Sequence, residues 1–92
     1  MAEEKVLTKH PLGKQGRSIS KEKYDTVKKA MLSALRGREL THAELTDAVV
    51  KKLKGKFTGN IAWFGETVKL DLEARLTIER TRSRPQRYRL KS

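Results

Sequence analysis

The chain contains no cysteine, only two prolines and few aromatic residues. Without cysteine, neither a disulfide framework nor a thiolate-bound metal site can form. The two histidines, His10 and His42, are far apart in the sequence and have no carboxylate cluster beside them. We therefore expect no metal centre and no cofactor. A nucleophile with an adjacent base and an orienting group is also missing, so we do not expect an enzyme.

Long hydrophobic runs are absent as well. No apolar stretch approaches the roughly 18 residues needed to cross a bilayer. The first residues, Met-Ala-Glu-Glu-Lys-Val-Leu, lack the apolar segment of a signal peptide. We therefore expect a cytoplasmic protein with no membrane partner. A length of 92 residues suits one small domain.

Acidic residues are missing from the C-terminal segment. Residues 80–91 hold six cations and no acid, which is more than half of the formal net charge of +11. Such crowding is relieved when a polyanion neutralises it. The segment also has the pattern of a β-hairpin, with Ile78, Tyr88 and Leu90 as apolar anchors and Pro85 in the turn. The sequence thus predicts a cationic hairpin that contacts nucleic-acid phosphates, with Tyr88 facing the core.

Hydrophobic periodicity predicts three helices, at about 20–36, 41–54 and 60–75, and two strands, at 77–80 and 86–90. Ile19 and Tyr24 are spaced to form a hydrophobic staple at the first helix. Thr41 and Glu44 are spaced to form a capping box at the second helix. A short third strand can form at Leu40, between the first two helices.

The N-terminal segment lacks such a pattern. Residues 1–19 contain Pro11, Gly13 and Gly16 and show no helical periodicity. We expect a mostly mobile arm over 1–19, attached by Val6, Leu7 or Leu12, and one domain over 20–92.

Two sequence stretches resemble a known fold family. Val68-Lys-Leu-Asp-Leu-Glu-Ala-Arg75 and Ile78-Glu-Arg80 resemble the end of the recognition helix and the first wing strand of winged-helix regulators. Together with Trp63 and the Pro-x-Arg at 85–87, they also resemble a small family of uncharacterised bacterial winged-helix domains. The resemblance covers about 24–90. It implies an α+β fold, a three-helix winged helix-turn-helix with a C-terminal two- or three-stranded antiparallel wing.

One position departs from this resemblance. Leu76 stands where relatives usually carry glycine, and a leucine at positive φ costs about 1–2 kcal/mol. We therefore expect the corner between the third helix and the wing to be built differently.

The winged-helix resemblance implies binding to double-stranded DNA, for example by a transcription regulator. The start of the third helix would enter the major groove, and the wing would contact the backbone or minor groove. The candidate contacts in the wing are Arg80, Arg82, Arg84, Arg87 and Arg89. On the third helix, Asn60 and Lys69 can address base edges, and Thr58 and Thr67 can hold phosphates.

The charge of the third helix opposes this interpretation. Between residues 59 and 75 three acids outnumber two cations. Asp71 and Glu73 can pair with Lys69, Arg75 or the wing arginines, whereas Glu66 has no evident partner.

Two apolar residues of the same helix, Trp63 and Leu70, lie opposite its core-facing side. They are covered by the arm or wing, or they form the seam of a homodimer, or Trp63 stacks on a base. Two other functions therefore stay open. One is a protein-interaction or dimerisation module that uses the third helix, and the other is an RNA- or ribosome-associated binder.

Overall fold

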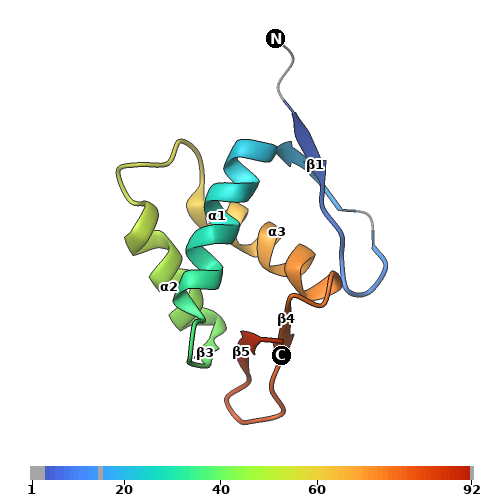
Figure 1. The fold of residues 1–92 in the computed structure, drawn as a ribbon, viewed down its shortest axis with the longest axis vertical. Helices are drawn as coiled ribbons and strands as arrows, with labels where there is room; N and C mark the ends of the chain where they lie inside the picture. Colours follow the sequence, from blue (N-terminus) through green and yellow to red (C-terminus); the bar gives the residue numbers. More distant parts are fainter. Residues whose placement is uncertain (1–3, 15, 92) are drawn as a thin grey trace.

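The computed structural model describes residues 4–14 and 16–91. Its three helices are α1 (Lys21–Ala34), α2 (His42–Leu53) and α3 (Ile61–Ala74). One antiparallel sheet pairs β1 (Lys5–Leu7) with β2 (Ser18–Ser20). The other has the order β3–β5–β4, formed by β3 (Leu40–Thr41), β4 (Ile78–Arg80) and β5 (Arg87–Leu90). The protein is therefore an α+β domain, as the sequence predicts. Figure 1 shows the two sheets at opposite ends of the helical body.

Local capping interactions place the helix starts where the sequence predicts them. The Ser20 hydroxyl accepts a hydrogen bond from the Lys23 N–H at the start of α1. At α2, the Thr41 hydroxyl accepts from the Glu44 N–H (3.2 Å), and the Glu44 carboxylate accepts from the Thr41 N–H (2.9 Å). This is the predicted capping box. Asn60 caps α3 by accepting from the Trp63 N–H at 3.0 Å.

The three helices and both sheets contribute to one apolar core. Its buried residues are Ile19, Tyr24, Val27, Ala30, Met31, Leu35, Leu45, Val49, Leu53, Val68, Leu72, Ile78 and Tyr88. Burial of each large aliphatic side chain contributes about 1.5–3 kcal/mol. The prediction that Tyr88 faces the core is confirmed. Among the described residues, every helix is too short or too polar to span a bilayer.

The strand at Leu40 is present and joins the C-terminal strands to the helices. Leu40 pairs with Tyr88, and Ile78 pairs with Leu90. We call β4, β5 and the loop 81–86 between them the C-terminal hairpin. Because β5 pairs with strands on both sides, this hairpin is fixed to the segment between α1 and α2.

The N-terminal segment contains strands that the sequence analysis did not predict. Val6 pairs with Ile19, and we call β1, β2 and the loop between them the N-terminal hairpin. Val6 packs against the core, whereas Leu7 and Leu12 are exposed. Each strand has only three residues, too few for an alternating pattern to be recognised in the sequence.

The corner after α3 corrects one expectation. Leu76 adopts a φ of 61°, the left-handed conformation that glycine would take there. Its N–H donates to the Glu73 carbonyl (3.1 Å), and the Thr77 N–H donates to the Leu72 carbonyl (2.9 Å). These two bonds define a Schellman motif. The expectation of a different corner is therefore wrong. The hydrogen bonds to the Leu72 and Glu73 carbonyls are those of a glycine-ended helix, although the residue here is leucine.

Candidate nucleic-acid interface

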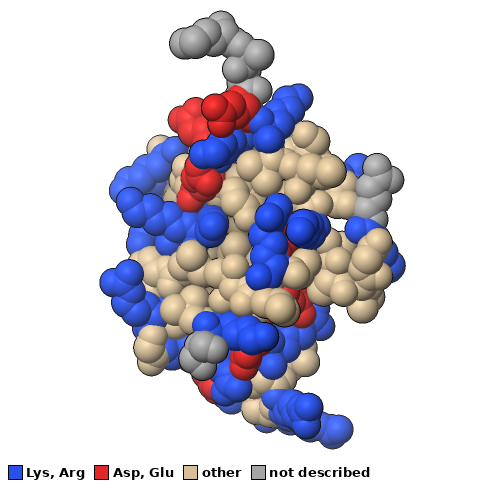
Figure 2. Space-filling view, turned by 45° about the vertical axis from the view of Figure 1, so that its right-hand side comes forward, with Lys and Arg blue, Asp and Glu red and all other residues tan. Residues whose placement is uncertain are grey.

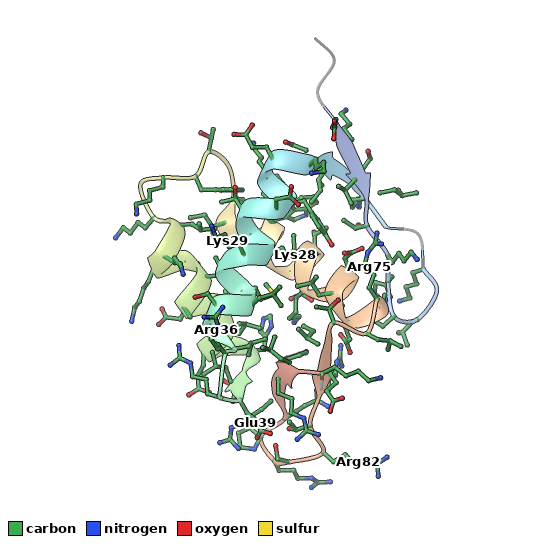
Figure 3. The ribbon with its side chains drawn as sticks, viewed as in Figure 1. Lys28, Lys29, Arg36, Glu39, Arg75 and Arg82 are labelled. Atoms are coloured by element: carbon green, nitrogen blue, oxygen red, sulfur yellow. The ribbon has the colours of Figure 1, made fainter. Side chains whose placement is uncertain are left out.

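The loop of the C-terminal hairpin is closed by a chain of side-chain hydrogen bonds. The Arg87 N–H donates to the Thr81 hydroxyl (3.0 Å), and the Thr81 and Ser83 hydroxyls lie 2.6 Å apart. The Ser83 hydroxyl donates to the Pro85 carbonyl (3.0 Å), across a cis Arg84–Pro85 peptide bond. A backbone bond from the Thr81 N–H to the Arg87 carbonyl (2.7 Å) completes the closure. These bonds fix the backbone of the loop, and Arg82 projects from it (Figure 3).

Two of the five predicted wing arginines form ion pairs within the protein. Arg80 pairs with Glu73, and this hydrogen bond raises the pKa of the guanidinium. Arg89 pairs with Glu79 (2.8 Å) and Glu39 (3.1 Å), which raise its pKa in the same way. These two side chains therefore hold the C-terminal hairpin to α3 and to the segment before β3.

The other three arginines remain available to a ligand. Arg82, Arg84 and Arg87 have no carboxylate within 4.0 Å among residues 4–14 and 16–91. Arg82 and Arg84 are exposed, and Arg87 is half-buried. The predicted set of arginines thus divides into two that form internal ion pairs and three that can meet phosphates.

Two further arginines, which the sequence analysis missed, lie near the same end of the molecule. The capping hydrogen bonds lower the pKa of Glu44, and the charges of Arg87 and Arg38 lower it further. Arg38 and Arg87 are therefore both within electrostatic reach of the start of α2. Arg36 is exposed beyond the end of α1, on the side of the C-terminal hairpin (Figure 3). In the sequence, this placement is indicated by the Arg36-Gly-Arg38 turn, which comes just before the strand at Leu40 that pairs with β5.

Lys69 does not fit the role that the resemblance implied. Its side chain is only 6% exposed, and its Nζ lies 3.0 Å from the Glu66 carboxylate and 2.7 Å from His42 Nδ1. The ammonium also sits 4.7 Å from the centre of the Tyr88 ring. A buried, paired ammonium cannot reach a base edge, so this prediction is corrected. The same contact supplies the partner that Glu66 lacked in the sequence analysis.

The other polar candidates near α3 do not lie together. Asn60 is exposed, but its side-chain oxygen is used by the helix cap. Thr58 lines a hollow of about 180 Å³ against the start of α1, together with Lys23 and Lys56. Thr67 lines a different hollow, between α3 and the N-terminal hairpin. These residues therefore do not form one surface that could read bases together.

The N-terminal hairpin lies against Trp63 and Leu70. The hollow between them has a volume of about 160 Å³ and is also lined by Thr8, Lys9, His10, Gly16 and Arg17. Trp63 contacts Phe64 edge-on at 5.0 Å between ring centroids but remains 42% exposed. The arm therefore covers this face in part. A dimer seam and base stacking remain predictions.

A buried carboxylate attaches the N-terminal hairpin to α3. Asp71 is fully buried and accepts hydrogen bonds from the Lys9 N–H (2.8 Å), from Arg75 Nε (2.9 Å) and from the Tyr24 hydroxyl. Arg75 was a predicted partner, and Lys9 and Tyr24 were not. Asp71 therefore serves the fold and is not available for acid–base chemistry.

One family model matches this chain. It describes a family of unknown function, DUF6958, and it matches residues 5–88. The chain belongs to this family. The match runs from β1 into β5 and thus includes the N-terminal hairpin. No curated protein and no solved structure matches the chain.

Positive charge dominates the surface of this DUF6958 domain. Among the described residues, the cations with a carboxylate within 4.0 Å are Lys21, Lys51, Lys69, Arg75, Arg80 and Arg89. The other sixteen of the 22 lysines and arginines have no such partner in the described part of the chain. Figure 2 shows lysines and arginines over much of one face, with the acids in small groups between them. In the same described residues, no group of three metal-ligating side chains could hold an ion.

Proposed function

We propose that this domain binds the phosphate backbone of double-stranded DNA through its C-terminal hairpin. The observation that carries the proposal is the placement of Arg82, Arg84 and Arg87. Arg82 and Arg84 lie in a hydrogen-bonded loop and Arg87 begins β5 beside it, and the three have no acidic partner among the described residues. Because the loop backbone is already ordered, its ordering adds little to the entropic cost when these arginines meet phosphates.

The order of elements supports a winged-helix interpretation of the fold. The strand β3 lies between α1 and α2 and pairs with β5, the last strand of the hairpin that follows α3. In a winged helix, α2 and α3 form the helix-turn-helix and the hairpin is the wing. The C-terminal hairpin would then contact the backbone or the minor groove.

Phosphate contacts are expected to dominate over base reading. Lys69 is buried, and the acids Glu66 and Glu73 line a hollow over α3. Phosphate contacts position a protein on DNA but carry no sequence information. We therefore expect weakly specific binding, with Kd on the order of 10⁻⁴–10⁻⁶ M at physiological salt. This behaviour suits a nucleoid-type binder better than a regulator of one operator.

Fluorescence anisotropy with labelled duplex DNA at several salt concentrations tests the proposal. The triple variant R82Q/R84Q/R87Q should bind more weakly, and the slope of log K against log salt should become shallower by about 2–3. The matched control K28Q/K29Q/K52Q removes the same charge from α1 and from the side of α2 that contacts it, where Lys52 donates to Ser33. An equal loss of affinity in both variants would show that binding depends on the total charge and not on the position of these arginines, which would contradict the proposal. Parallel titrations with structured RNA separate the RNA-binding alternative.

A protein-interaction module is the second candidate function. It is favoured by the 42% exposure of Trp63 and by the exposed Leu12, which lines a hollow with Leu70. Analytical ultracentrifugation of the wild type and of Trp63→Ala tests it. A dimer that the substitution abolishes, together with no affinity for DNA, would replace the first proposal.

A further inference from the structure

We propose that the N-terminal hairpin is a second phosphate-binding element, which contacts the duplex on the flank of α3 opposite to the C-terminal hairpin. This inference rests on the proposed function and extends it to residues outside the predicted wing. It predicts that the domain holds the DNA backbone from two sides.

The positions of the contacts on α3 place the two hairpins on different flanks. Lys69 and Glu73 are one helical turn apart and contact Tyr88 and Arg80 of the C-terminal hairpin. Thr67 and Ala74 lie about two turns apart and face the N-terminal hairpin, with Asp71 between them bonded to Lys9. At 100° per residue, these two rows are separated by more than a quarter of the helix circumference. The outward strip of α3 therefore lies between the two hairpins.

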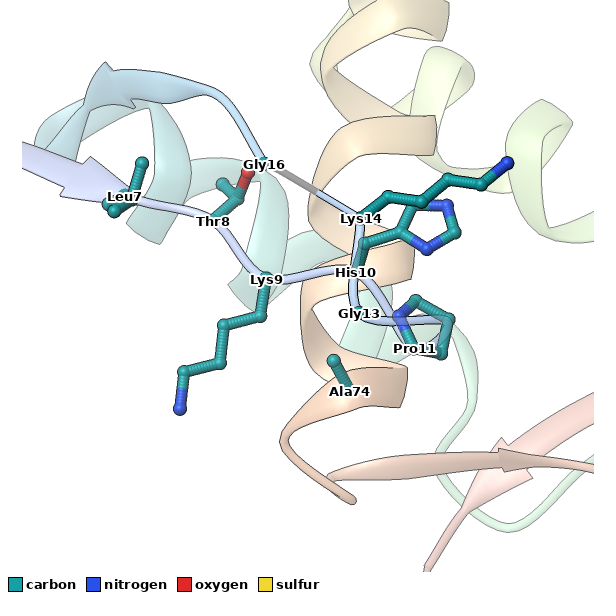
Figure 4. Close-up of a pocket in the computed structure, with 9 residues that line it drawn as sticks. All are labelled: Leu7, Thr8, Lys9, His10, Pro11, Gly13, Lys14, Gly16 and Ala74. Carbon is teal, nitrogen blue, oxygen red and sulfur yellow. The ribbon is translucent and has the colours of Figure 1, made fainter.

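The N-terminal hairpin carries its own unneutralised charge. From Lys5 to Ser20, both included, the sequence holds four cations and no acid. Lys9, Lys14 and Arg17 are exposed, and no carboxylate in the described part of the chain lies within 4.0 Å of their charged side-chain groups. Figure 4 shows Lys9 and Lys14 extending from the loop in different directions, with the His10 ring beside Lys14. The hollow drawn there, of about 410 Å³, lies between this loop and the end of α3.

Close contacts between Thr8 and residues 16–17 fix the base of this loop. The Thr8 N–H donates to the Arg17 carbonyl (2.9 Å), and the Arg17 N–H donates to the Thr8 hydroxyl (2.8 Å). Gly16 approaches so closely that a Cβ there would lie 1.7 Å from the Thr8 carbonyl oxygen. With the Lys9 N–H also bonded to Asp71, the backbones of Lys9 and Arg17 are fixed relative to α3. The element is thus preorganised for contact, as the C-terminal hairpin is.

The two hairpins meet at one hollow. His10 and Lys14 from the N-terminal loop and Arg80 from β4 line a cavity of about 370 Å³ over α3. The acids at its floor are Glu66 and Glu73, which Lys69 and Arg80 already neutralise. The remaining cations of both hairpins therefore set the sign of the potential that an approaching duplex meets.

The experiment compares three variants that each lose three positive charges. They are K9Q/K14Q/R17Q in the N-terminal hairpin, R82Q/R84Q/R87Q in the C-terminal hairpin and K28Q/K29Q/K52Q as the control. Each is titrated with the same labelled duplex DNA over a range of salt, after circular dichroism has confirmed that it is folded. We expect K9Q/K14Q/R17Q to weaken binding by about tenfold and to make the salt slope shallower by about 2–3, whereas the control changes little.

The outcomes separate this inference from the proposed function. If the wild type does not bind the duplex, the proposed function fails. If R82Q/R84Q/R87Q weakens binding while K9Q/K14Q/R17Q behaves as the control does, the proposed function holds and the second element is refuted. NMR amide shifts give an independent reading, because a contact should move the Gly13 and Gly16 signals in the wild type on addition of duplex. Unmoved signals would also overturn the inference.

Discussion

The hydroxyl of Tyr24 on α1 donates a hydrogen bond to the carboxylate of Asp71 on α3, a residue 47 positions later in the chain. Asp71 is fully buried and also accepts from Arg75 and from the main chain of Lys9. One carboxylate thus joins α1, α3 and the N-terminal hairpin. The cost of burying this charge is offset because the carboxylate accepts hydrogen bonds from three groups, one of which is the Arg75 guanidinium.

We expect Asp71→Asn to lower the free energy of unfolding by about 2–4 kcal/mol. The amide leaves one buried donor without an acceptor and removes the charge that Arg75 pairs with. Arg75 is 38% exposed and regains water, so it contributes the smaller part. Urea unfolding measures the change, and Tyr24→Phe, which removes only one donor, should cost about 1–2 kcal/mol. Equal stability of Asp71→Asn and wild type would show that this junction does not hold the fold.

The same pair makes stability depend on pH in the alkaline range. Burial and the hydrogen bond to Asp71 raise the pKa of Tyr24 well above its ordinary value of 10.0. The unfolded chain therefore loses the phenolic proton at a lower pH than the folded chain does. The stabilisation is complete below pH 10 and declines as pH rises above it, by up to about 1.4 kcal/mol per pH unit. Urea unfolding between neutral and alkaline pH should show this decline, and Tyr24→Phe should show a smaller one.

Local interactions explain which parts of the fold could be predicted from the sequence. The capping box of Thr41 and Glu44 involves residues three apart, so it is visible in the sequence. Ile19 and Tyr24, which are spaced for a hydrophobic staple, are both buried. The pairing of Val6 with Ile19 was not visible, because it joins two three-residue strands across a long loop. Long-range pairing of short strands leaves little periodicity to recognise.

In the candidate site, too, local features could be predicted from the sequence and long-range contacts could not. Its cationic hairpin was evident from composition, but the ion pairs of Arg80 and Arg89 depend on partners brought close only by the fold. The sequence predicts a contact between Lys69 and base edges, because Lys69 is a polar residue on the third helix. Its burial depends on His42 and Tyr88, which lie 27 residues before it and 19 after it. The charge of a side chain can be read from the sequence, whereas its availability to a ligand depends on tertiary contacts.

A second stability prediction concerns the corner after α3. Leu76 has positive φ and is 63% exposed, so its side chain contributes little packing to offset the strain. Leu76→Gly should therefore raise the free energy of unfolding by about 1 kcal/mol, because glycine adopts this conformation without a steric cost. Thermal unfolding followed by circular dichroism measures the effect. A lower melting temperature for the glycine variant would mean that the leucine side chain makes a compensating contact.

A matched pair of glycine substitutions tests the closure of the N-terminal hairpin. A Cβ at Gly16 would collide with the Thr8 carbonyl, whereas a Cβ at Gly65 within α3 meets no atom within 4 Å. Gly16→Ala should therefore destabilise by about 1–3 kcal/mol, through displaced backbone. Gly65→Ala should stabilise by up to about 1 kcal/mol, through helix propensity. Hydrogen exchange should show faster opening at Thr8 and Arg17 in Gly16→Ala alone. Unchanged exchange there would mean that the loop does not depend on this contact.

The division of the C-terminal arginines predicts opposite effects for two neighbouring substitutions. Arg82 has no ion-pair partner among the described residues, so Arg82→Gln should change the free energy of unfolding by less than about 0.5 kcal/mol. It should nevertheless weaken binding to duplex DNA. Arg80→Gln leaves Glu73, which is only 14% exposed, without its cation, and should cost up to about 1 kcal/mol of stability. Its effect on DNA affinity should be the smaller of the two. Urea unfolding and anisotropy on both variants measure the contrast. Similar losses of affinity would show that Arg80 leaves Glu73 for a phosphate when DNA binds, so that the ion pairs of the hairpin would themselves be part of the interface.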